Sequence, residues 1–193
     1  MKTLWTVSAI LLLAACSSAS SEVKDDGQPT AIMPAKGGGD LISEKGDVSG
    51  DGKPDVWNFY RELPDPQDPT VSKRVLFKKE ADLNFDGRKD IVRLFDDDGL
   101  LTREEADLDY DGETDQVNIY EKGVLTQKHI YRGNKQVFIW KFFEEGKMVR
   151  LVRDNTGNGR PDYCELWYAG EKLSKKGWDK TGDGECDYWE NAD

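Results

Sequence analysis

The chain is built from three parts that occur together in the stretch Asp107-Leu108-Asp109-Tyr110-Asp111-Gly112-Glu113-Thr114-Asp115-Gln116-Val117-Asn118-Ile119-Tyr120-Glu121-Lys122-Gly123. Residues 107–115 form an acidic loop with one glycine, and residues 116–120 alternate between polar and apolar side chains. An alternation with a period of two, carried by β-branched and aromatic residues, predicts a β-strand. The closing residues 121–123 predict a tight turn.

The acidic loop occurs five times along the chain. Each copy has Asp at position 1, Ser, Asn, Asp or Thr at position 3, Asp or Asn at position 5, Gly at position 6 and Asp at position 9. Five copies of this pattern are far beyond chance, and they indicate a structural repeat of about 25 residues. The copies, which we number loop 1 to loop 5, span residues 47–55, 82–90, 107–115, 154–162 and 179–187.

Strand-like stretches and Gly-containing turns alternate with these loops. The alternating stretches after the loops are 56–60, 91–95, 116–120 and 163–167, and the turns are 96–99, 121–123, 144–147 and 169–172. Each turn leads into another short strand, so the sequence predicts an all-β fold, an antiparallel β-meander with the acidic loops at one end of the strands. Repetition alone leaves three arrangements open, namely a closed barrel, an open curved sheet and a radial array of hairpins.

Two intervals depart from the repeat. The distance from loop 3 to loop 4 is about two repeat lengths, and Arg132-Gly133-Asn134-Lys135 stands where a further acidic loop is expected. We therefore predict a plain turn there, in a unit that has lost its site but kept its strands. Between loops 1 and 2, the Pro-rich insertion Pro64-Asp65-Pro66-Gln67-Asp68-Pro69 predicts an exposed loop.

The spacing of oxygen-bearing residues in the loops suits calcium. Calcium takes about six to eight oxygen ligands, and short side chains at alternate positions of a tight loop can converge on one ion. Position 7 can add a backbone carbonyl, and Gly at position 6 permits the sharp turn. The predicted side-chain ligands are Asp47, Ser49, Asp51 and Asp55 in loop 1, Asp82, Asn84, Asp86 and Asp90 in loop 2, Asp107, Asp109, Asp111 and Asp115 in loop 3, Asp154, Thr156, Asn158 and Asp162 in loop 4, and Asp179, Thr181, Asp183 and Asp187 in loop 5.

This pattern resembles the calcium loop of the EF-hand. In loops 4 and 5 the resemblance extends to position 12, where Glu165 and Glu190 stand in place of the bidentate carboxylate, so it implies both as further ligands. The strand-like flanks depart from the EF-hand and from dockerins, and the loops are more similar to calcium loops between β-strands, as in integrin-type repeats. Plain Asp-Gly turns are the alternative, but a turn needs only one such pair.

The loops should differ in affinity for calcium. All four predicted ligands of loop 3 are carboxylates, whereas loop 4 has two carboxylates and needs Glu165 for a third. Loop 2 contains Arg88 and Lys89, whose charges should weaken cation binding. Extracellular sites with few charges have dissociation constants of about 10⁻⁴ to 10⁻³ M, which indicates a structural role for the ions.

The N-terminal segment resembles a bacterial lipoprotein signal. A positive start at Lys2 and a short apolar run lead to Leu13-Ala14-Ala15-Cys16, which is similar to a lipobox. The run is too short to cross a bilayer of about 30 Å as a helix. The resemblance implies a signal peptide over residues 1–15 and diacylglycerol and palmitate on Cys16, the alternative being an ordinary signal peptide with a chance cysteine.

The remaining chain divides into a tether and one domain. Residues 16–40 are rich in Ser, Gly and Pro and predict a flexible tether, and residues 41–193 have the size of a single domain. Ser17 is not the aspartate that resembles an inner-membrane retention signal, so we predict anchoring at the outer membrane.

The net charge of the chain limits the kinds of partner it can bind, and its cysteines predict a disulfide. The 27 basic and 38 acidic residues give a net charge of −11, which disfavours nucleic acid and favours cations. In an oxidising compartment Cys164 and Cys186 should form a disulfide, worth about 3 kcal/mol on the chain-entropy model. Two free buried thiols are the alternative.

No catalytic constellation is evident, and we predict that the protein is not an enzyme. His129 is the only histidine, and the chain has no Gly-rich phosphate loop and too few His and Cys residues for zinc. We expect a structural or protein-interaction module of the cell envelope, in adhesion, motility or assembly, similar in size and plan to the outer-membrane lipoproteins of myxobacterial gliding motility. Alternatively, an exposed stripe that includes Trp140, Trp167, Trp178 and Trp189 could bind polysaccharide, although core packing would also explain these rings.

Overall fold

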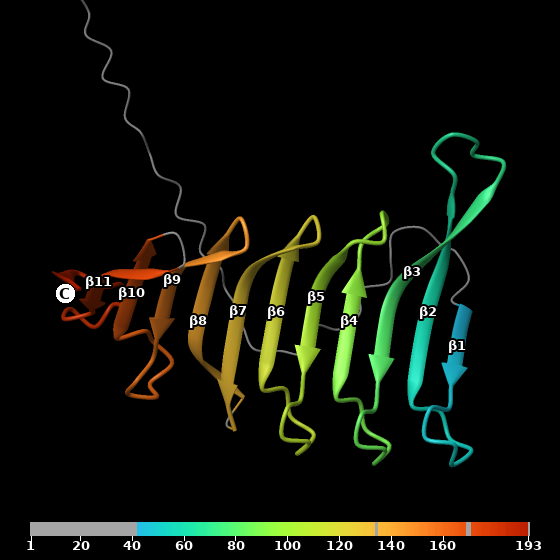
Figure 1. The fold of residues 1–193 in the computed structure, drawn as a ribbon, viewed down its shortest axis with the longest axis horizontal. Helices are drawn as coiled ribbons and strands as arrows, with labels where there is room; N and C mark the ends of the chain where they lie inside the picture. The colour runs from blue at the N-terminus through green and yellow to red at the C-terminus, as the bar shows by residue number, and fades with distance from the viewer. Residues whose placement is uncertain (1–41, 134, 169–170, 193) are drawn as a thin grey trace, which may run out of the picture.

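The structure of the chain is a computed structural model that describes residues 42–133, 135–168 and 171–192. Within these ranges the chain forms one antiparallel sheet of 12 strands, which follow one another across the sheet in chain order (Figure 1). The predicted all-β meander is therefore confirmed. The strands are β1 (Ile42–Gly46), β2 (Val56–Pro64), β3 (Ser72–Ala81), β4 (Ile91–Phe95), β5 (Leu101–Ala106), β6 (Gln116–Glu121), β7 (Val124–Arg132), β8 (Gln136–Glu144), β9 (Lys147–Arg153), β10 (Tyr163–Tyr168), β11 (Lys172–Trp178) and β12 (Tyr188–Asn191).

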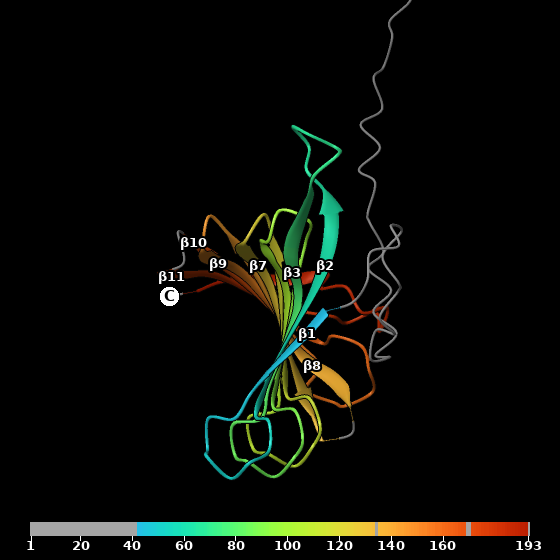
Figure 2. The ribbon, with the colours of Figure 1, turned by 90° about the vertical axis from the view of Figure 1, so that its right-hand side faces the viewer.

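The sheet is open, because β1 and β12 form its two edges and do not pair with each other. Of the three arrangements left open by the sequence, the structure has the open sheet. Figure 2 shows it as a strongly twisted single layer, and this twist follows from the handedness of L-residues. Within the described ranges no second layer covers the sheet, so many strand side chains stay half-buried, as along the whole of β4.

The two kinds of connection lie at opposite ends of the strands, as predicted (Figure 1). We call these the loop end and the turn end. Loops 1 to 5 join β1 to β2, β3 to β4, β5 to β6, β9 to β10 and β11 to β12. Between β7 and β8 the loop end has only a plain turn, in which the Lys135 N–H donates to the Arg132 carbonyl at 2.9 Å. This unit therefore keeps its strands without an acidic loop.

The Pro-rich insertion extends the hairpin of β2 and β3 beyond the rest of the turn end (Figure 1). These strands have 9 and 10 residues, against 5 and 6 in β4 and β5. Residues 66–71 are exposed, as predicted for this segment. Pro64 is the last residue of β2 rather than part of the loop.

Part of the core of the sheet belongs to a row of paired residues that crosses all the strands. Val117, His129, Val152 and Cys164 in this row are at most 5% exposed, and they lie near the middle of the layer. We call this set the central row. It consists of Lys45, Trp57, Glu80, Val92, Glu105, Val117, His129, Trp140, Val152, Cys164, Gly177 and Trp189.

A second row lies one residue nearer the turn end in each strand. Its side chains point to the opposite face, and most of them are charged. Arg93 and Glu104 form an ion pair within it at 2.6 Å. We call this set the charged row. It consists of Glu44, Asn58, Lys79, Arg93, Glu104, Asn118, Lys128, Lys141, Leu151, Glu165, Lys176 and Glu190.

The predicted disulfide joins Cys164 of β10 to Cys186 of loop 5, with their Cα atoms 6.3 Å apart. Its free-thiol alternative is thereby excluded. Next to Cys164 in the central row is Gly177, and a Cβ at Gly177 would lie only 2.7 Å from the ring of Trp189. The glycine therefore allows Trp189 to pack across the row beside the disulfide.

The predicted signal peptide (1–15) and tether (16–40), with Cys16, lie outside the described residues. Within the described part of the chain, no helix is long and apolar enough to span a membrane.

Candidate metal centre

Each acidic loop is organised around the carboxylate at position 1. In all five loops one oxygen of this carboxylate accepts the backbone N–H of position 4, and the other accepts the N–H of position 6. In loop 3 the oxygens of Asp107 lie 2.7 Å from the nitrogens of Tyr110 and Gly112. Gly112 has a φ of 93°, which only glycine adopts readily. The glycine at position 6 therefore fits the turn as predicted.

The carboxylate at position 9 closes each loop from the other side. It accepts the N–H of position 2 in all five loops and also that of position 3 in loops 1 to 4. In loop 1 this carboxylate belongs to Asp55, which is 3% exposed. Hydrogen bonds from the N–H groups of Ser49 and Val48 lower the pKa of Asp55 below its ordinary value of 3.8, against the opposing effect of burial. The carboxylate therefore stays charged at neutral pH.

Hydrogen bonds also lower the pKa of two position 1 carboxylates, Asp154 and Asp179. Asp154 is 1% exposed, and this burial is the largest single influence on its pKa and would raise it. Hydrogen bonds from Gly159, Gly157, Thr156 and Asn158 together outweigh burial and lower the pKa. The pKa of Asp179 is lowered chiefly by the N–H of Gly184. Both aspartates thus present a negative charge that a cation can share.

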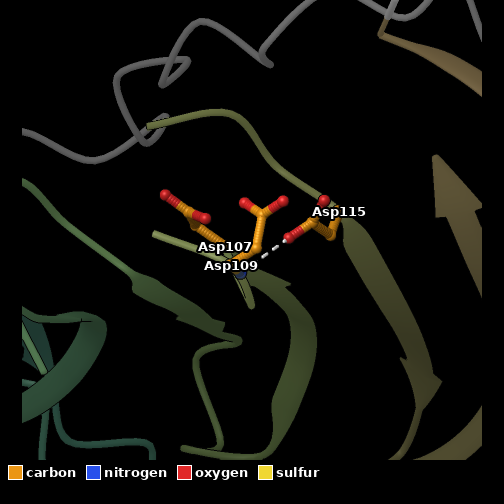
Figure 3. A group of neighbouring side chains, drawn as sticks. All are labelled: Asp107, Asp109 and Asp115. Carbon is orange, nitrogen blue, oxygen red and sulfur yellow. Dashed lines mark hydrogen bonds between the residues drawn. The ribbon is translucent and has the colours of Figure 1, made fainter. Parts of the chain in front are cut away.

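Three carboxylates come together in loop 3 (Figure 3). One oxygen each of Asp107, Asp109 and Asp115 lies within 4.8 Å of the others. Two oxygens bound to one calcium ion, at roughly 2.3–2.6 Å each, can be up to about 5 Å apart, so one ion can contact all three. The group can therefore hold a metal ion. Asp111, also predicted as a ligand, is not in the group, and its Oδ1 accepts the N–H of Glu113 at 2.7 Å.

Across the described residues, this is the one group of three or more acidic, Cys or His side chains with such spacing. The other loops differ because they have a neutral side chain at position 3. In loops 1, 4 and 5 the position 3 hydroxyl donates to a position 1 oxygen at 3.2–3.3 Å. The oxygens of positions 1 and 3 therefore converge in these loops as well, with less negative charge. These hydroxyls belong to Ser49, Thr156 and Thr181.

Position 5 makes the same turn in every loop. Its Oδ1 accepts the N–H of position 7 at 2.7–2.9 Å. The amide of Asn158 does this as well as the carboxylates of the other loops, so the turn itself requires no charge. In loop 2 the position 3 side chain, Asn84, donates to Asp86 at 3.2 Å, which places these two predicted ligands together.

The glutamates at position 12 are not brought to the loops. Glu165 lies within β10, where its carboxylate accepts hydrogen bonds from the Tyr163 hydroxyl and the Trp167 indole, both at 3.0 Å. Glu190 in β12 accepts the hydroxyl of Tyr188 at 2.8 Å. The physical reason is that a strand follows each loop, whereas the EF-hand position depends on a helix that turns residue 12 back to the ion.

Loop 2 contains a buried carboxylate oxygen without a partner. Oδ2 of Asp90 accepts the N–H groups of Leu83 and Asn84, whereas Oδ1 is buried and has no hydrogen-bond partner. Asp90 is only 2% exposed, and buried polar atoms are almost always satisfied in folded proteins. A cation at this loop would supply the missing partner, so the residues present fit a metal ion.

The side chain at position 7 connects neighbouring loops, a role that the sequence pattern did not reveal. Long polar side chains at this position are visible in the sequence, but their reach depends on the register of the sheet. They join Arg88 to the carbonyl of Asp111 at 2.9 Å, Arg160 to the carbonyl of Gly182 at 3.1 Å, and Glu113 to the ammonium of Lys135 at 3.3 Å. Arg88 is thus shared between loops 2 and 3.

The backbone also links the loops to one another. The position 1 N–H of Asp82 donates to the position 9 carbonyl of Asp55 at 2.8 Å, and Asp107 donates to Asp90 in the same manner. Asp179 repeats this bond to Asp162 at 3.2 Å. Loops 1, 2 and 3 are therefore connected to one another, and loop 4 is connected to loop 5.

The aromatic side chains pack against one another and against cations. The ring of Trp178 lies 5.9 Å from those of both Tyr163 and Tyr188. Lys180 covers Tyr188 at 3.7 Å, and Lys89 lies over the ring of Trp57. The rings therefore contact one another and nearby lysines within a single layer, and Tyr188 remains 41% exposed.

Comparison with known proteins finds no family model that matches the chain and no similar curated protein.

Proposed function

We propose that this protein is a calcium-binding, lipid-anchored protein of the bacterial cell envelope, whose β-domain is a structural or protein-interaction module in adhesion, motility or assembly. The acidic group in loop 3 carries this proposal. Ligand sets made only of oxygen favour hard cations over transition metals. Calcium suits these loops better than magnesium because it tolerates a variable number of ligands, whereas magnesium demands near-ideal octahedral geometry.

Connections between the loops support a structural role for the ions. Without a cation, each loop holds two or more carboxylates close together, and their mutual repulsion opposes the compact state. An ion in one loop removes this repulsion. Because Asp82 and Asp107 each donate to the preceding loop, a restraint on one loop also restrains the next pair of strands.

A change confined to loop 3 tests the calcium site. Asp109→Asn removes one charge from the acidic group but keeps a side-chain oxygen for the N–H of Asp111. We expect it to weaken the tightest calcium-binding step about tenfold or more, because ligand charge sets affinity in such loops. The measurement is calorimetric titration with calcium. Asp98→Asn, an equal charge change at the exposed turn end, is the matched control and should leave the titration unchanged.

Calorimetry and thermal melting of the wild-type protein test the proposal as a whole. The proposal would be contradicted if calorimetry found no heat of calcium binding and calcium caused no rise in melting temperature. For the interaction role, the measurement is affinity isolation from the native envelope with calcium or with chelator. Recovery of no partner under either condition would count against an interaction module and leave a purely structural one.

The lipobox-like Leu13-Ala14-Ala15-Cys16 supports the lipid anchor and the envelope location. Mass spectrometry of the chain extracted from membranes should find a mature N-terminus at Cys16 that carries acyl chains. A mature N-terminus at any other residue would contradict the anchor without affecting the calcium sites.

A further inference from the structure

Large apolar side chains are exposed at position 2 of loops 1 to 3 and at position 4 of loops 2 and 3. We call this set the tip row. It consists of Val48 (71% exposed), Leu83 (50%), Phe85 (51%), Leu108 (59%) and Tyr110 (44%). Loops 4 and 5 have Asn155, Gly157, Lys180 and Gly182 at the same positions. The apolar tips are thus a property of three neighbouring loops and not of the loop fold.

Two tip residues have a left-handed backbone conformation that glycine would adopt with less strain. Phe85 has a φ of 64° and Tyr110 a φ of 66°. This left-handed region is unfavourable for bulky side chains, and the other loops have glycine at position 4. Because these residues are 51% and 44% exposed, packing within the domain does not explain their presence. A contact with a partner outside the domain would explain why these two residues are present.

The tip row runs along the loop end of the sheet (Figures 1 and 2). Loops 1 to 3 lie side by side at the loop end in both views of the sheet (Figures 1 and 2). Consecutive loops are separated by two strand spacings, about 10 Å, so the row is roughly 20 Å long. Exposed apolar side chains along a rim fit a surface broader than the row itself.

Calcium in these loops would keep open coordination positions. The residues at position 12 of loops 1 to 3 are Asn58, Arg93 and Asn118, and all three lie in the charged row within strands. They therefore do not provide the bidentate carboxylate of an EF-hand loop. An external hard oxygen can fill the vacant positions. The phosphate group of a phospholipid offers such oxygens, and its negative charge complements the ion.

We propose that the tip row docks on an anionic phospholipid bilayer when calcium is bound. Lipid phosphates complete the coordination of calcium in loops 1 to 3, while the tip row enters the headgroup region. This proposal rests on the proposed calcium binding, because without ions the acidic loops and the anionic lipids repel each other. The segment between Cys16 and Ile42 could span on the order of 80 Å if extended, far more than the length of β1, so an anchored domain can turn its loop end to the membrane.

Vesicle co-sedimentation tests this docking. The full chain with Cys16→Ser, which cannot be acylated, is mixed with vesicles of phosphatidylcholine and phosphatidylglycerol, in calcium or in chelator. The calcium-dependent fraction is measured, because apolar residues of the leader contribute equally in both conditions. We expect binding in calcium only. The triple variant Leu83→Ser, Phe85→Ser and Leu108→Ser should bind about tenfold or more weakly, because it loses the inserted apolar surface.

A matched control removes three exposed apolar side chains from the turn end. Val71, Leu100 and Val124 are 52%, 40% and 50% exposed, and their joint replacement by Ser should leave vesicle binding unchanged.

Calorimetry with calcium separates the failure of the docking proposal from the failure of the calcium-binding proposal. A chain that binds calcium but not vesicles, or a tip variant that binds vesicles as well as its parent, overturns the docking alone. A chain that binds no calcium overturns both.

Discussion

The buried aspartates at position 1 must stay ionised for the loops to keep their shape. Asp154 uses both carboxylate oxygens to accept backbone N–H groups of its own loop. A protonated carboxyl would turn one of these acceptors into a donor facing an N–H group. The same carboxylates are the predicted calcium ligands, so the charge that shapes the loop is also the charge that binds the ion.

This double role gives a pH dependence to the stability of the calcium-free protein. The pKa values of Asp55, Asp154 and Asp179 lie below the ordinary 3.8 in the folded state. Their contribution is therefore fully present above about pH 4 and is lost as the pH falls through the folded values. Urea unfolding in calcium-free buffer should show a falling midpoint in this range. Asp154→Asn should flatten the dependence, and a midpoint that does not change with pH would contradict the assignment.

The strained position of Phe85 leads to a second prediction at this scale. Phe85→Gly should leave the free energy of unfolding unchanged or raise it by up to about 1 kcal/mol, because glycine adopts a φ of 64° without steric cost. Removal of a large apolar side chain usually has the opposite effect. Denaturant unfolding in chelator measures this. Phe85→Ala is the control, since it truncates the ring but keeps the Cβ, and it should be less stable than the glycine variant.

At the scale of elements, the starts of the strands after loops were predictable and the register between strands was not. The predicted stretches that begin at residues 56, 91, 116 and 163 coincide with the starts of β2, β4, β6 and β10. Position 9 of each loop fixes these starts, because its carboxylate closes the loop immediately before the strand. The partner of each strand residue depends on the neighbouring strand, which a pattern within one strand does not encode.

The same distinction separates the parts of the site that could be predicted from the rest. The spacing of positions 1, 3, 5 and 9 along the chain predicted four ligands in loop 3, and the structure brings together three of them, Asp107, Asp109 and Asp115, without Asp111. Glu165 was assigned by analogy to a helix-flanked loop, and the strand directs it elsewhere. The contact of Arg88 with loop 3 required knowledge of the register.

The disulfide gives a prediction for the last two strands. It joins β10 to loop 5, across a sequence separation of 22, and so retains β11 and β12 at the edge of the sheet. Joint replacement of Cys164 and Cys186 by Ser should lower the free energy of unfolding by about 3 kcal/mol. Amide hydrogen exchange should become faster in β12 while β6 and β7 change little. Equal acceleration in all strands would contradict this local role.

At the scale of the molecule, an open single layer has little apolar burial of its own. The fully buried side chains are few and belong largely to the central row and to the loop aspartates. Each strand touches only its neighbours in the sheet, so stability accumulates from one repeat to the next, as in solenoid proteins. Ions along the loop end would therefore contribute a larger share of the stability here than in a domain with a second layer.

An open sheet also has two unpaired edges, and the charged row bears on what can happen there. If β12 of one molecule paired with β1 of another in the register of the turn-end hairpins, Tyr188 would stand opposite Gly46 and Glu190 opposite Glu44. Within the molecule the printed registers place cations opposite each other at Lys79 and Arg93 and at Lys128 and Lys141, but they place no two carboxylates opposite each other in the charged row. Two glutamates directly opposite each other are unfavourable.

The edges can be tested by reversing one charge. Glu190→Lys would place a lysine opposite Glu44 of a second molecule, and it should increase the concentration-dependent association of the protein. Sedimentation velocity measures this. Glu121→Lys makes the same charge change away from both edges and should leave the sedimentation coefficient unchanged. An unaltered Glu190→Lys profile would show that the edges are protected in another way.

Charge at the edges thus bears on how far the sheet can grow. A meander of identical units has no geometric reason to stop, and molecules added end to end would build a fibre. Glu44 and Glu190 oppose that growth by repulsion between molecules, while the strands of a single chain are held in register by their covalent connections. The protein would remain a short ribbon of fixed length, with its loops free to meet something other than another copy of itself.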